Sequence, residues 1–112
     1  MLRLLLVEDD PSVRRAMDRR LRASGVHAVL AATLGEGIAA LDGCDIVIVD
    51  LNLPDGCGTD LLRLIRLASR PVRVAIYTGA ADAEAIVARS GERPNALFRK
   101  PADLDRVLAW VA

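Results

Sequence analysis

The chain has 112 residues, a length that suits one domain built around one hydrophobic core. Hydrophobic residues make up 53% of it and charged residues 27%, a composition of globular proteins that excludes an intrinsically disordered chain. Fifteen basic residues balance fifteen acidic ones, so the net charge gives no reason to expect binding to nucleic acid or to a membrane surface.

Five apolar runs of strand length alternate with segments of helical periodicity. We expect strands at Leu2–Val7, Ala28–Ala31, Asp45–Val49, Val72–Tyr77 and Ala96–Arg99. The runs LLLV and IVIV, in the first and third of these, lack the polar alternation of a strand with one solvated face, so we place them at the centre of the sheet. The alternation predicts a single α/β domain over residues 1–112 with a parallel sheet.

Five helices are expected between and after these strands. They are Pro11 up to Gly25, Leu34 to Leu41, Leu61 to Ala68, Asp82 to Arg89, and Leu104 to Val111. Asp10 precedes Pro11 and suits an N-cap, while proline suits the first helical position. The fourth helix has few large apolar residues, so we expect it to be weakly buried.

Polar side chains follow four of the predicted strands. They are Glu8, Asp9 and Asp10 after the first, Asp50 after the third, Thr78 and Gly79 after the fourth, and Lys100 and Pro101 after the fifth. The functional crevice of an open parallel sheet lies beyond the carboxyl ends of its strands, so these groups should converge. Taken singly, an acidic residue there more often caps a helix, which is the role we assign to Asp10.

A cluster of carboxylates is costly because like charges raise one another's pKa and resist joint ionisation. We therefore expect a cation between Glu8, Asp9 and Asp50. Oxygen ligands in small number, with water completing the coordination, suit magnesium better than calcium. A buried strand that ends on Asp50 would hold this carboxylate rigidly as a nucleophile or a metal ligand.

Four motifs in order, LLVEDD, VDLNLPDGCG, IYTG and LFRKPAD, make the whole chain resemble a response-regulator receiver domain of two-component signalling, of the chemotaxis-regulator type. The resemblance implies a flavodoxin-like doubly wound (βα)5 fold, with a five-stranded parallel sheet in the order 2-1-3-4-5 and helices on both faces. It implies a bacterial phosphoprotein switch that takes a phosphoryl group from a histidine kinase or phosphotransfer protein.

The resemblance also implies roles by position. Asp50 would be the phosphoacceptor, Thr78 and Lys100 would contact phosphoryl oxygens, and Mg2+, or alternatively Mn2+, would be held by Glu8, Asp9, Asp50 and the backbone carbonyl of Asn52. The peptide bond between Lys100 and Pro101 is expected to be cis.

Three positions depart from the family pattern. Leu97 replaces an aromatic residue that commonly moves on activation, Gly79 replaces alanine, and Glu8 replaces aspartate. The family signals, and in some members dimerises, through the face of the fourth helix, fifth strand and fifth helix. Trp110 in the fifth helix lies beside the apolar stripe, so it either faces a partner or packs against a neighbouring element.

Two other functions remain open, a small phosphatase with an aspartyl intermediate and a receiver-like binding module that is not phosphorylated. Asn52 stands where such a phosphatase would need a second acid, so we favour a switch that catalyses only its own phosphorylation and dephosphorylation. The absence of an apolar run of roughly 18 residues and the early acids of MLRLLLVEDD predict a cytoplasmic domain. The kinase and the output remain unidentified, and the chain is either a stand-alone regulator or a piece of a longer protein.

Overall fold

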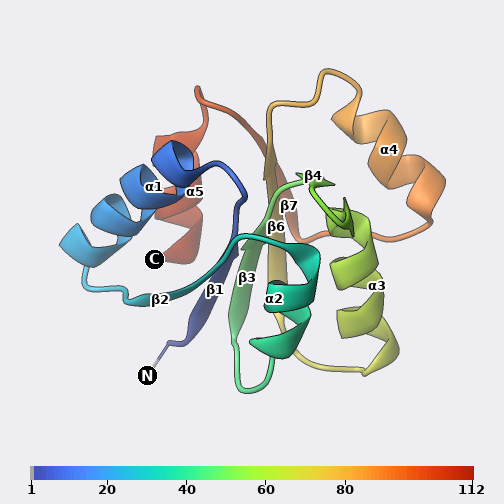
Figure 1. The fold of residues 1–112 in the computed structure, drawn as a ribbon, viewed down its shortest axis with the longest axis horizontal. Coiled ribbons are helices and arrows are strands. Elements are labelled where there is room, and N and C mark those ends of the chain that lie inside the picture. Colours follow the sequence, from blue (N-terminus) through green and yellow to red (C-terminus); the bar gives the residue numbers. More distant parts are fainter. Residues whose placement is uncertain (1) are drawn as a thin grey trace.

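The computed structural model describes residues 2–112, in which five parallel strands form a sheet between two layers of helices (Figure 1). The sheet strands are β1 (Leu4–Val7), β2 (Ala28–Ala31), β3 (Ile46–Val49), β6 (Arg73–Thr78) and β7 (Ala96–Arg99). Their order is β2-β1-β3-β6-β7, and every neighbouring pair is parallel. This confirms the predicted flavodoxin-like order, in which each strand of the sheet occupies its expected place.

The helices are α1 (Pro11–Ala23), α2 (Leu34–Ala39), α3 (Gly58–Leu67), α4 (Ala83–Ser90) and α5 (Leu104–Val111). The boundaries differ from the predicted ones by at most three residues, the largest difference being the earlier start of α3 at Gly58. A short antiparallel hairpin, β4 (Asn52–Leu53) with β5 (Gly56–Cys57), was not predicted, because two-residue strands carry no periodic signal. No helix within residues 2–112 combines the length and the apolar composition needed to cross a lipid bilayer.

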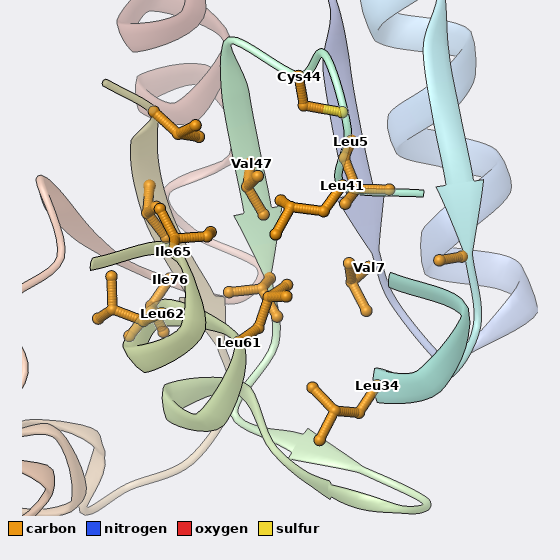
Figure 2. Close-up of a cluster of buried hydrophobic side chains, with 14 of the residues drawn as sticks. Leu5, Val7, Leu34, Leu41, Cys44, Val47, Leu61, Leu62, Ile65 and Ile76 are labelled. Atoms are coloured by element: carbon orange, nitrogen blue, oxygen red, sulfur yellow. The ribbon is translucent and has the colours of Figure 1, made fainter. Parts of the chain in front are cut away.

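Alternate residues of the central strands belong to different hydrophobic cores, because side chains on a strand point to opposite faces in turn. Leu5 and Val7 of β1 pack with α2 and α3, as Figure 2 shows, while Leu4 and Leu6 pack with α1 and α5. All residues of β1 and β3 are buried, which confirms their predicted central position. Each fully buried leucine contributes on the order of 1.5–3 kcal/mol, so these strands form a rigid support.

The edge strand β7 divides its two central side chains between these cores. Phe98 is buried on the side of α1 and α5, and Leu97 packs against the opposite cluster. Phe98 is therefore a core residue. Helix α4, whose apolar residues pack in the same cluster as α2 and α3, is weakly buried as expected, with Ala83 as its buried residue.

Helix α1 begins where the first motif predicted. The Asp10 carboxylate accepts hydrogen bonds from the Ser12 and Val13 N–H groups at 2.8 and 3.3 Å, and Pro11 occupies the first helical position. Because α1 begins directly after this cap, only three residues separate the helix from the end of β1, and the backbone of Glu8 and Asp9 therefore lies at the carboxyl edge of the sheet.

The turn of the β4–β5 hairpin is tied to the start of α2. The Asp55 carboxylate accepts hydrogen bonds from the Leu34 N–H at 2.7 Å and the Gly35 N–H at 2.9 Å. These bonds satisfy two of the free N–H groups of the helix terminus. The hydrogen bond from Gly35, followed by that from Leu34, lowers the pKa of Asp55 below its usual range.

Asp55→Ala should lower the melting temperature near neutral pH but not in acid. A carboxylate whose pKa is lowered by folding contributes stability above its unfolded pKa, about 4, and loses it as the pH falls through the lower folded value. The difference between wild type and variant, measured by thermal melts, should therefore shrink below about pH 4. Asp82→Ala is the control, since Asp82 makes no side-chain hydrogen bond to α4. A difference that persists unchanged in acid would contradict the prediction.

Candidate functional site

The carboxyl ends of the strands surround a cavity of about 320 Å³ at the edge of the sheet that lies uppermost in Figure 1. Its lining residues come from the segments that follow β1, β3, β6 and β7, and they are Glu8, Asp9, Asp10, Asp50, Asn52, Gly79, Ala80 and Lys100. Residues that are as far apart in the chain as Glu8 and Lys100 thus meet at one place. This is the convergence that the parallel topology predicts.

Three carboxylates meet in this cavity. One oxygen each of Glu8, Asp9 and Asp50 lies within 4.8 Å of the others. Glu8 and Asp50 are buried, with exposed fractions of 1% and 7%, whereas Asp9 is exposed. The first two therefore have fixed positions, and the third faces solvent at the rim.

Lys100 lies between the two buried carboxylates. Its Nζ is 2.7 Å from Oδ2 of Asp50, and it also forms an ion pair with Glu8. Burial alone would lower the pKa of Lys100, but the hydrogen bonds to Asp50 and Glu8 outweigh burial and raise that pKa above its usual value. Lys100 therefore stays charged and balances part of the negative charge of the cluster.

Glu8 is held on both of its carboxylate oxygens. One pairs with Lys100, and the other accepts a hydrogen bond from the Asp10 N–H at 3.2 Å. Burial raises the pKa of Glu8 above its usual value, and the hydrogen bond from Lys100 offsets this only in part. Because Glu8 is already engaged on both sides, Asp9 is the carboxylate best placed to bind an ion directly.

The donor set of the cavity fits a hard divalent cation. Carboxylate oxygens are the ligands that magnesium prefers. The cluster offers the buried carboxylate of Asp50 and the exposed carboxylate of Asp9, next to Glu8, which is paired with Lys100. A cation there would relieve the repulsion that Lys100, with a single charge, cannot fully compensate. The structure thus brings together the three carboxylates of the predicted metal site, and that they bind an ion stays a prediction.

The backbone below the acidic pair is fixed by a residue that the sequence did not single out. Nη1 of Arg14 donates hydrogen bonds to the carbonyl oxygens of Glu8 at 2.8 Å and Asp9 at 3.3 Å. The sequence could not identify this role, because α1 contains several arginines and helical periodicity does not show which of them turns back to the loop before the helix.

The opposite wall of the cavity is the turn after β6. Thr78 is completely buried, and its hydroxyl accepts a hydrogen bond from the Ala80 N–H at 3.2 Å, while Gly79 and Ala80 line the cavity. Thr78 thus lies directly behind the wall, not in the lining itself. A Cβ added to Gly79 would meet no atom within 4 Å, so alanine would fit there.

Helix α3 approaches Asp50 so closely that its first residue must be small. A Cβ added to Gly58 would lie 2.2 Å from the Asp50 carbonyl oxygen. The Gly58 N–H donates to the Leu51 carbonyl at 3.0 Å, which fixes this approach. The sequence showed the glycine within DGCG but not its contact.

Two predicted features on the β7 side are resolved by the structure. The Lys100–Pro101 peptide bond is cis, as expected. Trp110 is half-buried and packs edge-on against Phe98, with ring centroids 6.2 Å apart, and the Arg73 guanidinium lies 4.4 Å from its ring centre. Most of the Trp110 side chain therefore packs against neighbouring residues, as one of the two predicted alternatives had it, although part of the ring remains accessible to solvent. Leu97 lines a hollow of about 590 Å³ beside α4.

Comparison with known proteins agrees with this geometry. The family model described as response regulator receiver domain matches residues 4–112. The cell cycle response regulator CtrA of Brucella ovis is 32% identical over 113 residues, which cover 98% of this chain and 48% of that protein. The chain therefore spans about half the length of the curated relatives it matches.

Solved structures give the same result. The CheY-like receiver domain protein of Methanospirillum hungatei has a TM-score of 0.82 and 27% identity, over 99% of this chain and 90% of that one. The non-phosphorylated HemR receiver domain of Leptospira biflexa has a TM-score of 0.77 and 27% identity, over 97% and 95%. Together with the acidic cavity and its lysine, these matches show that the chain belongs to the response regulator receiver domain family of two-component signalling.

Proposed function

We propose that this domain is a switch in which Asp50 accepts a phosphoryl group from a histidine kinase or phosphotransfer protein. The observation that carries the proposal is the position of Asp50. Its carboxylate follows the buried strand β3, lies 2.7 Å from the Lys100 ammonium, and lines a cavity that also contains Glu8 and Asp9. A rigid carboxylate with cationic neighbours is the arrangement that phosphoryl transfer to an aspartate requires.

In the transfer step, an oxygen of Asp50 would bond to phosphorus as the bond from phosphorus to the donor's imidazole nitrogen breaks. The residues of this domain act mainly by position and charge, because such a transfer needs little other covalent chemistry. Glu8, Asp9 and Asp50, with the backbone carbonyl of Asn52, would hold Mg2+ or alternatively Mn2+, and the ion would neutralise charge on the phosphoryl oxygens.

Lys100 and Thr78 would stabilise the phosphoryl group once it is attached. Lys100 can turn from Asp50 towards a phosphoryl oxygen while it keeps its ion pair with Glu8. The Thr78 hydroxyl accepts from the Ala80 N–H, so its own proton stays available for donation to a phosphoryl oxygen. We propose that the same groups support the later hydrolysis, so the domain catalyses only its own phosphorylation and dephosphorylation, in the cytoplasm.

Treatment with acetyl phosphate and magnesium tests the proposed function. The domain should accumulate about one acid-labile phosphoryl group per chain. A phosphatase would instead release phosphate continuously without accumulating a labelled form. A binding module would not react, and either result would contradict the proposal.

Magnesium should also stabilise the unphosphorylated domain, because the ion relieves repulsion among Glu8, Asp9 and Asp50. At ten times its dissociation constant the gain is about 1.4 kcal/mol, or roughly 4–6 °C in melting temperature. Asp9→Ala should lose this response, and Asp105→Ala, which removes an exposed carboxylate paired with Arg20 on another side of the domain, should keep it. An equal response in Asp9→Ala would place the ion elsewhere.

We further propose that the phosphorylated domain signals, and in a dimer self-associates, through the face of α4, β7 and α5. Leu97 and the accessible part of Trp110 line hollows beside β7, which supports this assignment. Leu97→Ala or Trp110→Ala should weaken binding of the kinase or output partner severalfold in a folded, phosphorylatable domain, as measured by titration calorimetry. Normal binding by both variants, with a loss in Arg15→Ala on α1, would show that the face is misplaced.

A further inference from the structure

Arg99, the last residue of β7, connects the edge of the sheet to the wall of the cavity. Its Nη1 donates a hydrogen bond to the Ala80 carbonyl at 2.9 Å, and its Nη2 forms an ion pair with Glu84 in the first turn of α4. Ala80 lines the cavity, and its N–H donates a hydrogen bond to the Thr78 hydroxyl. Both polar groups of the Ala80 backbone are therefore held by side chains.

The backbone of Arg99 is itself firmly placed. Arg99 lies opposite Thr78 in the register of β6 and β7, and its N–H donates to the Asp103 carboxylate at 2.8 Å. The next residue is Lys100, whose N–H donates to the Thr78 carbonyl at 2.9 Å. The backbone of Arg99 is thus fixed next to Lys100, and the Arg99 guanidinium binds the turn that follows β6.

We infer that Arg99 is a positioning residue for the phosphoacceptor site, because it fixes the turn of Thr78, Gly79 and Ala80 against the cavity. The inference rests on the proposed function, since it concerns where Thr78 lies when Asp50 is phosphorylated. Arg99 acts through the Ala80 carbonyl. Because the Ala80 N–H donates to the Thr78 hydroxyl, the same turn also fixes the position of that hydroxyl relative to Asp50.

The two bonds of Arg99 differ in what they contribute, which distinguishes a positioning role from a general stabilising one. The side chains of Arg99 and Glu84 are 39% and 66% exposed, so their ion pair contributes little to global stability. The hydrogen bond to the Ala80 carbonyl joins two segments that are 19 residues apart, and it is charge-assisted. Its loss should therefore loosen the turn locally while most of the domain keeps its stability.

Arg99→Met tests the inference because methionine keeps the unbranched aliphatic stem of the side chain but lacks the guanidinium, and so removes both bonds. The first measurement is amide hydrogen exchange of Ala80 in the unphosphorylated domain, which should become about fivefold faster, the factor expected for one lost hydrogen bond. The second is phosphorylation by saturating acetyl phosphate, which should slow about three- to tenfold, with the half-saturating magnesium concentration unchanged because Arg99 bonds to Ala80 and Glu84 rather than to the acidic cluster.

Three further variants make the test specific. Arg99→Lys keeps the charge and should recover part of both effects. Glu84→Gln removes the ion pair but leaves the Ala80 bond, so it should change phosphorylation little. Arg63→Met is the matched control, since Arg63 also donates to a backbone carbonyl, that of Ser90 at 3.2 Å, and pairs with a glutamate, Glu92 at 3.4 Å, but touches no residue that lines the cavity.

The outcomes decide the inference separately from the proposed function. Unchanged exchange at Ala80 in Arg99→Met would overturn it, and so would faster exchange with normal phosphorylation. Equal effects in Arg63→Met would also overturn it, because any arginine that bonds a backbone carbonyl would then suffice. If the wild type itself takes up no phosphate, the proposed function fails together with the role of Arg99 in it. The exchange rates of Ala80 then show only whether Arg99 holds the turn of Thr78, Gly79 and Ala80.

Discussion

Asp50→Asn should abolish phosphoryl uptake from acetyl phosphate with magnesium while the domain stays folded. An amide keeps the size of the side chain but lacks the anionic nucleophile that the transfer needs. Lys100 retains Glu8 as a partner, so the substitution does not leave its charge buried and unpaired. Labelling followed by mass spectrometry of peptides should show no phosphorylated residue in the variant and modification of Asp50 alone in the wild type.

The neighbouring acids supply the control for this result. Asp10 also lines the cavity, but its carboxylate caps α1, and asparagine is an equally good cap. Asp10→Asn should therefore fold and accept phosphate normally. Labelling of Asp50→Asn at Asp9 or Asp10 would show that the acceptor has been misassigned.

Gly58→Ala should strongly destabilise the domain, by about 3 kcal/mol or roughly 10–15 °C in melting temperature. Helix propensity predicts the opposite sign, because alanine is favoured over glycine by up to about 1 kcal/mol inside a helix. The added Cβ would lie 2.2 Å from the Asp50 carbonyl oxygen and 3.2 Å from a methyl group of Val49. Backbone on one side and a buried strand on the other leave no room for relaxation, so the contact outweighs the propensity.

Gly79→Ala is the matched control, since a Cβ there meets no atom within 4 Å. It should leave stability unchanged or raise it by about 0.4–1 kcal/mol through the smaller entropy of the unfolded chain. Denaturant titrations of both variants provide the comparison. Because the contact of Gly58 is with Asp50 itself, the folded fraction of Gly58→Ala should also accept phosphate more slowly. Wild-type stability in Gly58→Ala would mean that α3 does not approach Asp50 as closely as described.

The sequence by itself determined the features that depend on neighbouring residues. The apolar runs LLLV and IVIV identified two buried central strands, the periodicity of three to four residues identified the helices, and Asp10 with Pro11 marked the start of α1. The polar residues after four of the five strands also indicated the site. Parallel strands deliver their carboxyl ends to one edge, so Glu8, Asp50 and Lys100 had to meet there once the fold class was known.

Only the tertiary structure decided how these groups are held. Asp55 binds the start of α2 across 21 residues, Arg99 binds Ala80 across 19, and Gly58 touches the backbone of Asp50 through a helix that begins earlier than its apolar pattern suggests. None of these contacts has a local signature in the sequence, because arginine, aspartate and glycine also occur at many positions where they contact no distant segment. Which of them reaches the site depends on distances between segments that are brought together only when the sheet has formed.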